Sequence, residues 1–460
     1  MSELISSRAT TTLGELFRDY DGPPFAIRLW NGWTWSSAPG NGHAPACTLV
    51  LTTPKALQTL LLNPSQVSLG EAFLAKHIDV EGDLFSVFDV VEHVLRRPLP
   101  FRQRLLRALG ALGYAITHGP MHSRRRDRAS IAYHYDQPPE FFRPWLGPTL
   151  VYSCAYFQNE SDSLDAAQEQ KLDLICRKLR LHPGERFLDI GCGWGSLILH
   201  AAGRCGAEAD GITLSREQAG VAEQRIAGSG LRDSCRVALR DYRELDPAQR
   251  TWDKIASVGM SEHVGLNNLP RYFALAYRLL EPGGVFLNHA IARAEHSVPR
   301  GTDSFIRRYV FPDGELVTLT QTITVAERAG FEVRDVENLR EHYARTMRCW
   351  VEGLRRHRAA LLERVPERTY RIWLLYMAGC AAAFRRGDIA VYQVLLSKPD
   401  RGDSRLPLTR EDWYRPARQP AQRETPTPMR PVALADAVNS GYDTPSRKAE
   451  TAPQPARLIR

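Results

Sequence analysis

The stretch Phe187-Leu-Asp-Ile-Gly-Cys-Gly-Trp-Gly195 decides the fold. An apolar run ends at an acid, three glycines alternate with other residues, and a helical pattern opens at Ser196. Glycine permits a positive φ and lets a ligand approach the main chain, and the helix N-terminus offers free N–H groups. The spacing is G-x-G-x-G, not the G-x-G-x-x-G of dinucleotide-binding proteins. It favours S-adenosylmethionine over NAD as cofactor; a glycine-rich turn without a ligand is the alternative.

Strands and helices alternate around this loop. The apolar runs predict strands at residues 186–190, 207–213, 235–239, 252–259 and 284–291, with helices between them and a turn at Glu281-Pro-Gly-Gly. Such alternation predicts an α/β fold with a doubly wound, Rossmann-like parallel sheet. Its ligands bind beyond the carboxyl ends of the strands.

The chain has 460 residues, more than one ordinary hydrophobic core holds. Changes in composition divide it into four parts. We predict a small N-terminal α/β lipid-binding or docking domain at 1–95, a basic amphipathic linker at 96–130, a catalytic domain at 131–400 and a disordered tail rich in proline and arginine at 401–460. The N-terminal part contains no catalytic cluster, so a purely structural packing module is the alternative there.

Charge and cysteine content limit the partners and the compartment. Lys and Arg exceed Asp and Glu by 60 − 52 = 8, which favours an anionic partner. The first residues lack the apolar core of a signal peptide, and no run is long enough for a membrane span. Eight cysteines without a C-x-x-C pair make a metal site or a disulfide framework unexpected and suit a reducing cytoplasm.

The linker combines arginines such as Arg124, Arg125 and Arg126 with regularly placed leucines. A basic amphipathic segment can lie on an anionic membrane. A solvated connector between domains is an alternative of equal weight. There is no array of aromatic residues for base stacking and no nucleic-acid motif, so nucleic acid is not an expected partner.

Polar residues follow the second and third predicted strands. The second strand ends in Thr213-Leu-Ser215 with none of the acids that hold the ribose in many methyltransferases. Ser215-Arg-Glu-Gln218 has the pattern of a helix capping box, which needs no ligand. Ribose hydrogen bonds from Thr213 and Gln218 are the alternative. After the third strand, Asp241 is placed to accept from an adenine amino group and Tyr242 to stack on the ring.

The segment Gly259-Met-Ser-Glu-His-Val-Gly265 follows the fourth strand and places Glu262 and His263 where reacting groups are expected. His289 lies within the last strand, where it points either into the same pocket or into the core. The aromatic-rich segment from Ile131 to Phe157 surrounds Cys154 and predicts a pocket wall.

Seven motifs in order along the chain resemble the cyclopropane-fatty-acyl-phospholipid synthase family. They are His134-Tyr-Asp136, Tyr152-Ser-Cys-Ala-Tyr-Phe157, Leu188 to Gly195, Gly211 to Gln218, Ser257 to Gly265, Phe305 to Gly314 and Phe384 to Val394. The resemblance spans about residues 130–400, and the N-terminal part also looks like that of the family. Two departures are Pro138-Pro139 after the first motif and the tail beyond residue 400.

The resemblance implies a class I methyltransferase fold, S-adenosylmethionine as donor and the cis double bond of unsaturated phospholipid acyl chains at a membrane surface as substrate. It further implies a homodimer and peripheral attachment to the inner face of the membrane. By motif, the bicarbonate-binding catalytic residues are Cys154, Glu262, His289, Ile291 and Tyr343. The cofactor residues are Tyr152, Ser153, Asp189, Gly191, Gly193, Thr213, Leu214, Gln218, Asp241 and Tyr242. No metal is implied.

An alkene is a weak nucleophile, so the methyl donor must be held close to the double bond. Methyl transfer leaves a carbocation, which aromatic faces such as Tyr156, Phe157 or Tyr309 are expected to stabilise. Proton loss to bicarbonate closes a cyclopropane, whereas a hydride shift gives a methyl-branched or methylene chain. Two further alternatives are a non-catalytic lipid-binding homologue and a small-molecule methyltransferase.

Overall fold

The computed structural model describes residues 2–39, 44–62, 64–96, 138–297, 304–311 and 314–414. Most of the basic linker, the His134-Tyr-Asp136 motif and the tail beyond residue 414 lie outside these residues. The described residues up to Trp413 pack as one compact unit. The functional division at residues 95, 130 and 400 stays a prediction. No helix in the described ranges is both long and apolar enough to cross a membrane.

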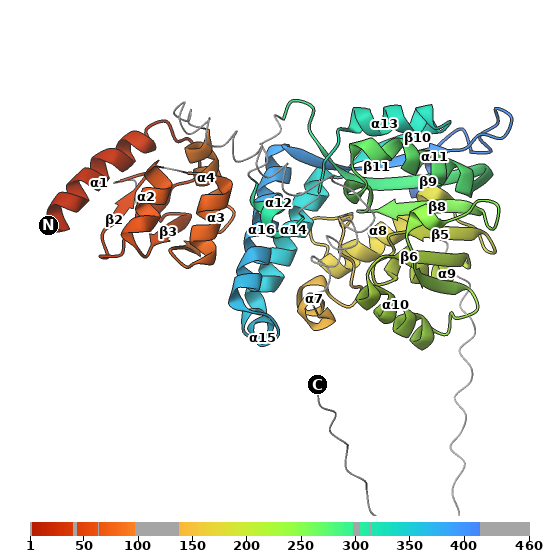
Figure 1. Cartoon of the computed structure of the whole chain (residues 1–460), viewed down its shortest axis with the longest axis horizontal. Helices are drawn as coiled ribbons and strands as arrows, with labels where there is room; N and C mark the ends of the chain where they lie inside the picture. Colours follow the sequence, from red (N-terminus) through yellow and green to blue (C-terminus); the bar gives the residue numbers. More distant parts are fainter. Residues whose placement is uncertain are drawn as a thin grey trace, which may run out of the picture. The chain divides into compact units, whose positions relative to one another are not determined.

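The N-terminal part builds its own small sheet. Its elements are α1 (Ser2–Leu16), β1 (Phe25–Arg28), β2 (Thr34–Ser36), β3 (Cys47–Leu51), α2 (Pro54–Leu62), α3 (Gln66–Leu74), β4 (Ile78–Gly82) and α4 (Val87–Leu95), with the sheet order β2-β1-β3-β4 (Figure 1). Strand β3 alternates in burial, so Cys47, Leu49 and Leu51 face the core with Leu13 and Val90. The result is an amphipathic sheet covered by helices.

The larger sheet has seven strands. They are β5 (Arg186–Ile190), β6 (Glu208–Thr213), β7 (Cys235–Leu239), β8 (Trp252–Val258), β9 (Leu280–Arg293), β10 (Glu332–Asn338) and β11 (Ile389–Ser397), in the order β10-β11-β9-β8-β5-β6-β7. The five predicted strands are all present and parallel, whereas β11 runs antiparallel between β9 and β10. The doubly wound α/β fold is confirmed.

One predicted turn is wrong. Glu281-Pro-Gly-Gly284 lies inside β9, which begins at Leu280. Gly283 has a φ of +81°, and the pairing of β9 with β8 shifts register between Trp252 and Lys254. A glycine at positive φ lets a strand absorb an irregularity without ending.

Helices cover both faces of this sheet (Figure 1). α8 (Leu164–Leu179), α9 (Ser196–Cys205) and α10 (Arg216–Ser229) share one apolar cluster with Phe187. α11 (Leu269–Leu279) and α13 (Leu319–Arg328) share another with Leu188. Because neighbouring strand residues point to opposite faces, β5 contributes to both clusters, as its unbroken apolar pattern predicts.

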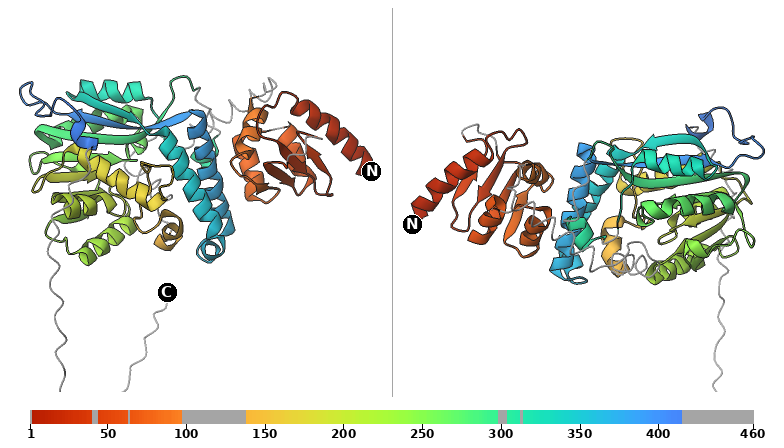
Figure 2. Two further views of the ribbon diagram at one scale, coloured as in Figure 1. Left: turned by 180° about the vertical axis from the view of Figure 1, so that it is seen from behind. Right: turned by 45° about the horizontal axis from the view of Figure 1, so that its top comes forward.

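A helical layer flanks the carboxyl side of the sheet. It contains α7 (Pro139–Leu146), α12 (Phe305–Tyr309), α14 (Arg340–Arg356), α15 (Arg358–Leu362) and α16 (Glu367–Arg386), and α17 (Glu411–Tyr414) follows β11. Helices α14 and α16 lie side by side in both views of Figure 2. Phe141, Phe142 and Trp145 of α7 pack with Trp350 and Trp373 of these helices. Many aromatic residues of the predicted pocket wall therefore serve as core.

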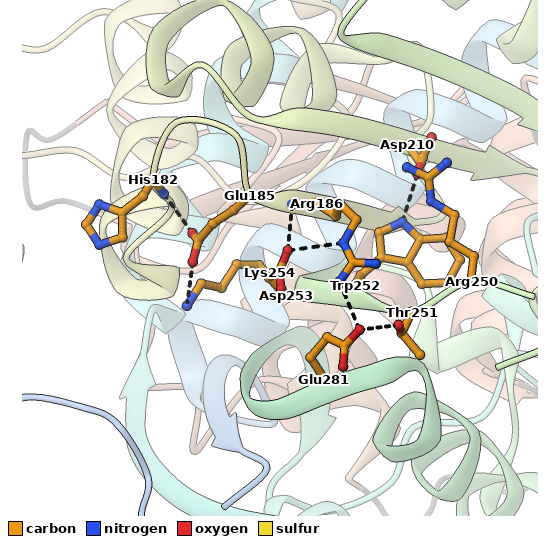
Figure 3. Close-up of polar contacts among 10 residues, drawn as sticks. All are labelled: His182, Glu185, Arg186, Asp210, Arg250, Thr251, Trp252, Asp253, Lys254 and Glu281. Carbon is orange, nitrogen blue, oxygen red and sulfur yellow. Dashed lines mark hydrogen bonds and ion pairs between the residues drawn. The ribbon is translucent and has the colours of Figure 1, made fainter. Parts of the chain in front are cut away.

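The amino ends of the strands are joined by a polar network (Figure 3). Arg186 donates from its backbone N to Asp253 at 2.8 Å and from Nη2 to Glu281 at 2.9 Å. Trp252 Nε1 donates to Asp210 at 2.8 Å. These contacts tie the strands together at the edge opposite their carboxyl ends, where ligands of such sheets bind.

Candidate active site

A cavity of about 150 Å³ opens at the carboxyl ends of β5, β6 and β8. Nine of the ten predicted cofactor residues line it: Tyr152, Ser153, Asp189, Gly191, Gly193, Thr213, Leu214, Gln218 and Tyr242. The structure thus brings together residues that are almost a hundred positions apart. Their individual contacts with a cofactor stay predictions.

The glycine loop shapes the floor of this cavity. Gly191 has a φ of +88°, and a Cβ there would lie 2.9 Å from Met260 Cγ. Only glycine fits such a position. Behind the loop, Gly195 precedes α9 at a φ of +82°, so the helix begins directly at the cavity. The main chain is thereby exposed to a ligand, as the sequence predicts.

Asp189 is the penultimate residue of β5, with only 3% of its surface exposed, and its Oδ1 has no hydrogen-bond partner among the described residues. Burial raises the pKa of its carboxyl group to about 7, against the opposing effect of Lys171. An unsatisfied carboxylate oxygen inside a cavity is costly, which suits a site that receives a hydrogen-bond donor from a ligand.

Lys171 is a site residue that the sequence does not reveal. It lies on α8, is 2% exposed, and donates from Nζ to Ser153 Oγ at 2.9 Å. Burial lowers the pKa of its ammonium group to about 8. In the sequence it is one polar residue in an amphipathic helix, and only its place on the apolar face, seven residues before the equally buried Lys178, signals its burial.

Gln218 does not complete the predicted capping box. Ser215 Oγ accepts from Gln218 N at 3.3 Å, which is half of the motif. The Gln218 side chain instead turns to Thr213, whose Oγ1 donates to Gln218 Oε1 at 2.8 Å and accepts from Ser215 N at 3.2 Å. This bond draws Gln218 to the cavity, so the ligand-binding alternative is the better supported one.

We expect Thr213→Val to weaken binding of S-adenosylhomocysteine about tenfold, because it removes two hydrogen bonds that hold Gln218 and the following turn. Isothermal titration calorimetry measures this. Thr322→Val is the matched control, since Thr322 is a buried threonine of α13 that donates to the backbone outside the cavity. Equal affinities for the two variants would contradict the expectation.

Asp241 is the one predicted cofactor residue that does not line the cavity. It precedes the 3₁₀ helix η1 (Tyr242–Glu244), and its carboxylate accepts from Arg243 N and Nε, both at 2.9 Å, and from Arg243 Nη2 at 2.7 Å. Arg243 itself lines the cavity. Tyr242 and Arg243 therefore line the cavity, whereas the Asp241 carboxylate is bound to Arg243 and does not line it.

The candidate catalytic carboxylate is fixed by the main chain. Glu262 lies in the 3₁₀ helix η2 (Ser261–His263), and its Oε1 accepts from Ile291 N at 2.8 Å. Its Oε2 is buried and has no partner in the ranges that the structure describes, and burial raises the pKa of the carboxyl group to about 7. The Ile291 backbone N–H, predicted with His289 as a bicarbonate contact, thus donates to Glu262 in the structure, and its role toward bicarbonate stays a prediction.

His289 lies on β9 two residues before Ile291, on the same side of the strand. Its Nδ1 lies 3.2 Å from Gln393 Nε2, while Nε2 is buried without a partner. Burial lowers the pKa of the imidazole to about 3, so the ring is neutral at pH 7. If Gln393 donates to Nδ1, the proton resides on Nε2.

Cys154 and Tyr343 complete the predicted set. Both belong to one apolar cluster, against which Ile291 packs. Cys154 is fully buried, and burial raises the pKa of its thiol, whose Sγ lies 3.2 Å from the carbonyl oxygen of Ala155. Burial raises the pKa of the Tyr343 hydroxyl well above its ordinary value, so this group also stays protonated at pH 7. A protonated thiol here is a hydrogen-bond donor.

The three aromatic residues suggested for stabilising a cation do not line the cavity. Tyr156 stacks on His342, and the Arg345 guanidinium lies 4.2 Å from the ring centre of Phe157. The Tyr309 hydroxyl donates to the Glu71 carboxylate at 2.7 Å. Tyr152, Trp194 and Tyr242 are the aromatic residues that do line it among those the structure describes. His263 lines it as well, with its ring against Phe311.

The family model described as mycolic acid cyclopropane synthetase matches residues 122–394, more than half of the chain. The chain belongs to this family. Residues 12–98 match a second model, described as a domain of unknown function. The seven-stranded sheet, the glycine loop and the cavity accordingly belong to an S-adenosylmethionine-dependent methyltransferase of the cyclopropane synthetase family.

Relatives in the family cover most of the chain. A probable fatty acid methyltransferase from Pseudomonas putida is 41% identical over 85% of this chain and 96% of its own length. The cyclopropane-fatty-acyl-phospholipid synthase of Escherichia coli K12 is 34% identical over 78% and 89%. The structure of the mycolic acid cyclopropane synthase CmaA1 complexed with SAH and CTAB matches at 35% identity and a TM-score of 0.56, covering 58% of this chain and 97% of that one.

Proposed function

We propose that the protein transfers a methylene or methyl group from S-adenosylmethionine to the cis double bond of unsaturated acyl chains in membrane phospholipids, forming cyclopropane fatty acids. The similarity to the E. coli cyclopropane-fatty-acyl-phospholipid synthase supports the substrate. The observation that carries the proposal is Glu262, which is held by Ile291 N two residues after the neutral His289 and whose Oε2 has no partner among the described residues.

The cofactor supplies an electrophilic methyl group. In the proposed reaction the π electrons of the alkene form the new C–C bond, and the bond from sulfur to the methyl carbon breaks. S-adenosylhomocysteine leaves, and the substrate carries a positive charge. A proton is then lost from the transferred methyl group, and its electron pair closes the ring. The chain must therefore hold the two reactants together, keep water away from the cation and provide for one proton.

We propose that a bicarbonate ion serves as the base. Two buried polar atoms without partners, Glu262 Oε2 and His289 Nε2, fit an ion that both donates and accepts hydrogen bonds. Ile291 fixes Glu262 from the main chain, and Cys154 and Tyr343 are placed as donors from the neighbouring apolar cluster. Cys154 acts in this proposal as a hydrogen-bonding group and not as a nucleophile, because burial keeps its thiol protonated.

A methyl-branched or methylene product is the second candidate. The names of two relatives favour it: the probable fatty acid methyltransferase of P. putida and the tuberculostearic acid methyltransferase UfaA1 of Mycobacterium tuberculosis, 33% identical over 78% of this chain. The cyclopropane and methylene outcomes share the cation and differ only in whether a hydride moves before the proton leaves. A saturated methyl branch forms only when a hydride donor then reduces the methylene group.

We further propose that the protein acts as a peripheral protein at the inner face of the membrane, and as a homodimer. The net charge of +8 and the arginines of segment 96–130 support attraction to anionic lipid. Replacing Arg124, Arg125 and Arg126 by alanine is then expected to weaken co-sedimentation with anionic vesicles, most clearly at low salt.

The deciding experiment is incubation of the protein with isotopically labelled S-adenosylmethionine and vesicles of dioleoyl phosphatidylglycerol. Gas chromatography with mass spectrometry then identifies the product after derivatisation, since a cyclopropane and a methylene chain have equal mass and fragment differently. Dipalmitoyl phosphatidylglycerol, which has no double bond, is the control. Binding to oleoyl vesicles without release of S-adenosylhomocysteine would instead support a non-catalytic lipid-binding protein.

A further inference from the structure

A second cavity, of about 190 Å³, lies against α16 and is hereafter the α16 cavity. Its walls come from β3, α3, β4 and α4 of the N-terminal part and from α12 and α16. Its lining is almost wholly apolar; Gln66, Glu92 and Arg386 are the only amide or charged side chains that line it among the described residues. An apolar cavity of this size accommodates apolar guests and does not hold water well.

Small residues on α16 create the space. Leu375, Gly379 and Ala383 follow one another at intervals of four residues and line the cavity. A Cβ on Gly379 would lie 3.1 Å from the Phe88 ring of α4. The opposite wall is held in place by Arg371, which is 6% exposed and donates from Nε to the carbonyl oxygen of Phe73 at 2.8 Å.

One layer of aromatic side chains separates the α16 cavity from the cofactor cavity. Tyr152 lines the cofactor cavity and Tyr376 lines the α16 cavity. The ring of Trp373 packs against both, with its centre 5.8 Å from that of Tyr152 and 6.2 Å from that of Tyr376. A second path runs through Phe311, whose ring lies 5.4 Å from that of His263 and 5.8 Å from that of Tyr376. Aromatic side chains therefore connect the wall of the α16 cavity with the wall of the cofactor cavity.

We propose that the α16 cavity holds the methyl-terminal half of the substrate acyl chain, beyond the reacting double bond. This inference rests on the proposed function. The charged head group of a phospholipid must stay in water, so the end of the chain that can enter an apolar space is the methyl end. Tyr376 and Arg386 are ten residues apart on α16, or about 15 Å. One whole acyl chain spans about half of a bilayer core, or about 15 Å, so the methyl-terminal half of a chain fits within this length.

Ala383→Leu tests the proposal by narrowing the cavity. The substrates are phosphatidylglycerol vesicles with myristoleoyl, palmitoleoyl or oleoyl chains, which share the position of the double bond from the carboxyl end and lengthen only on the methyl side. We expect the kcat/KM for oleoyl relative to myristoleoyl chains to fall about tenfold, as when one or two methylene groups lose apolar contacts. Substrates that keep the methyl end of oleate and shorten only the carboxyl side should show no such trend.

Val91→Phe narrows the cavity from α4 and is the second variant if Ala383→Leu fails to fold. Ala359→Leu, at an exposed site on α15, is the matched control and should keep the selectivity of the unaltered chain. An equal loss for all three chain lengths, or a trend that follows the carboxyl side, would overturn the proposal. No product from any unsaturated lipid with the unaltered chain would overturn the proposed function itself.

Discussion

Glu262→Gln is expected to lower kcat by roughly 100- to 10,000-fold, the range observed when a group that positions or transfers a proton is lost. The amide retains an oxygen that can accept from Ile291 N, so the local fold is preserved. The substitution removes the negative charge. With the amide oxygen accepting from Ile291 N, an NH2 group that can only donate takes the place of Oε2. Binding of S-adenosylhomocysteine, measured by calorimetry, should be unchanged, because Glu262 does not line the cofactor cavity.

The pH profile provides an independent test of the same group. Burial raises the pKa of Glu262 from its ordinary value of 4.5 to about 7, so the carboxylate takes up a proton as the pH falls through 7. The kcat of the unaltered chain should therefore decline below about pH 7. The residual activity of Glu262→Gln should lack that decline. A profile that is identical for both proteins would show that another group titrates.

Glu281→Gln is the matched control. Glu281 is a carboxylate at the amino edge of the sheet, where Arg186 and Thr251 donate to it (Figure 3). The same chemical change there should leave kcat and its pH dependence unaltered. If the two variants lost activity equally, the effect would stem from the fold and not from the position of Glu262.

The sheet could be predicted from the sequence because its signal is local. Apolar strand patterns and the glycine loop place β5, β6, β7, β8 and β9 correctly, with errors at the ends of strands. The irregularity in β9 escapes prediction because Pro282-Gly283-Gly284 has the composition of a turn, and the strand continues because Leu280 and Val285 on either side of it both pair with β8.

The missing parts of the site depend on contacts that local sequence does not encode. The sequence shows that Lys171 is a charged residue, but not that it is buried. Its burial follows from the packing of α8 on the sheet. The pairing of Asp241 with Arg243 requires the 3₁₀ turn between them. The α16 cavity is lined by both Phe88 and Gly379, which are almost three hundred residues apart, so no local sequence pattern predicts it.

Asp189→Asn should weaken the binding of S-adenosylhomocysteine by roughly ten- to hundredfold, the value of a hydrogen bond to a charged group. Asp189 lines the cofactor cavity at the end of β5, and its Oδ1 has no partner in the described part of the chain. Asparagine preserves the shape and one acceptor but not the charge. Calorimetric titration at pH 8, where the carboxyl group is ionised, measures the loss.

The same substitution should make the ligand-free protein more stable above pH 7. Burial raises the pKa of Asp189 to about 7 from 3.8. Between these values the folded state binds more protons than the unfolded state, so stability falls as the pH rises, and the full penalty remains above pH 7. Asp189→Asn removes the penalty. Its melting temperature should exceed that of the unaltered chain by a few degrees at pH 8 and not at pH 4.

A gain in stability together with a loss of binding distinguishes a carboxylate kept for a ligand from one kept for the fold. Asp253→Asn supplies the contrast, because Asp253 accepts from Arg186 N at the opposite edge of the sheet. There the charge is paired, so its removal should lower the melting temperature and leave binding unchanged. If Asp189→Asn also lowered the melting temperature at pH 8, Lys171 would be the partner that satisfies Asp189, and the carboxylate would belong to the fold.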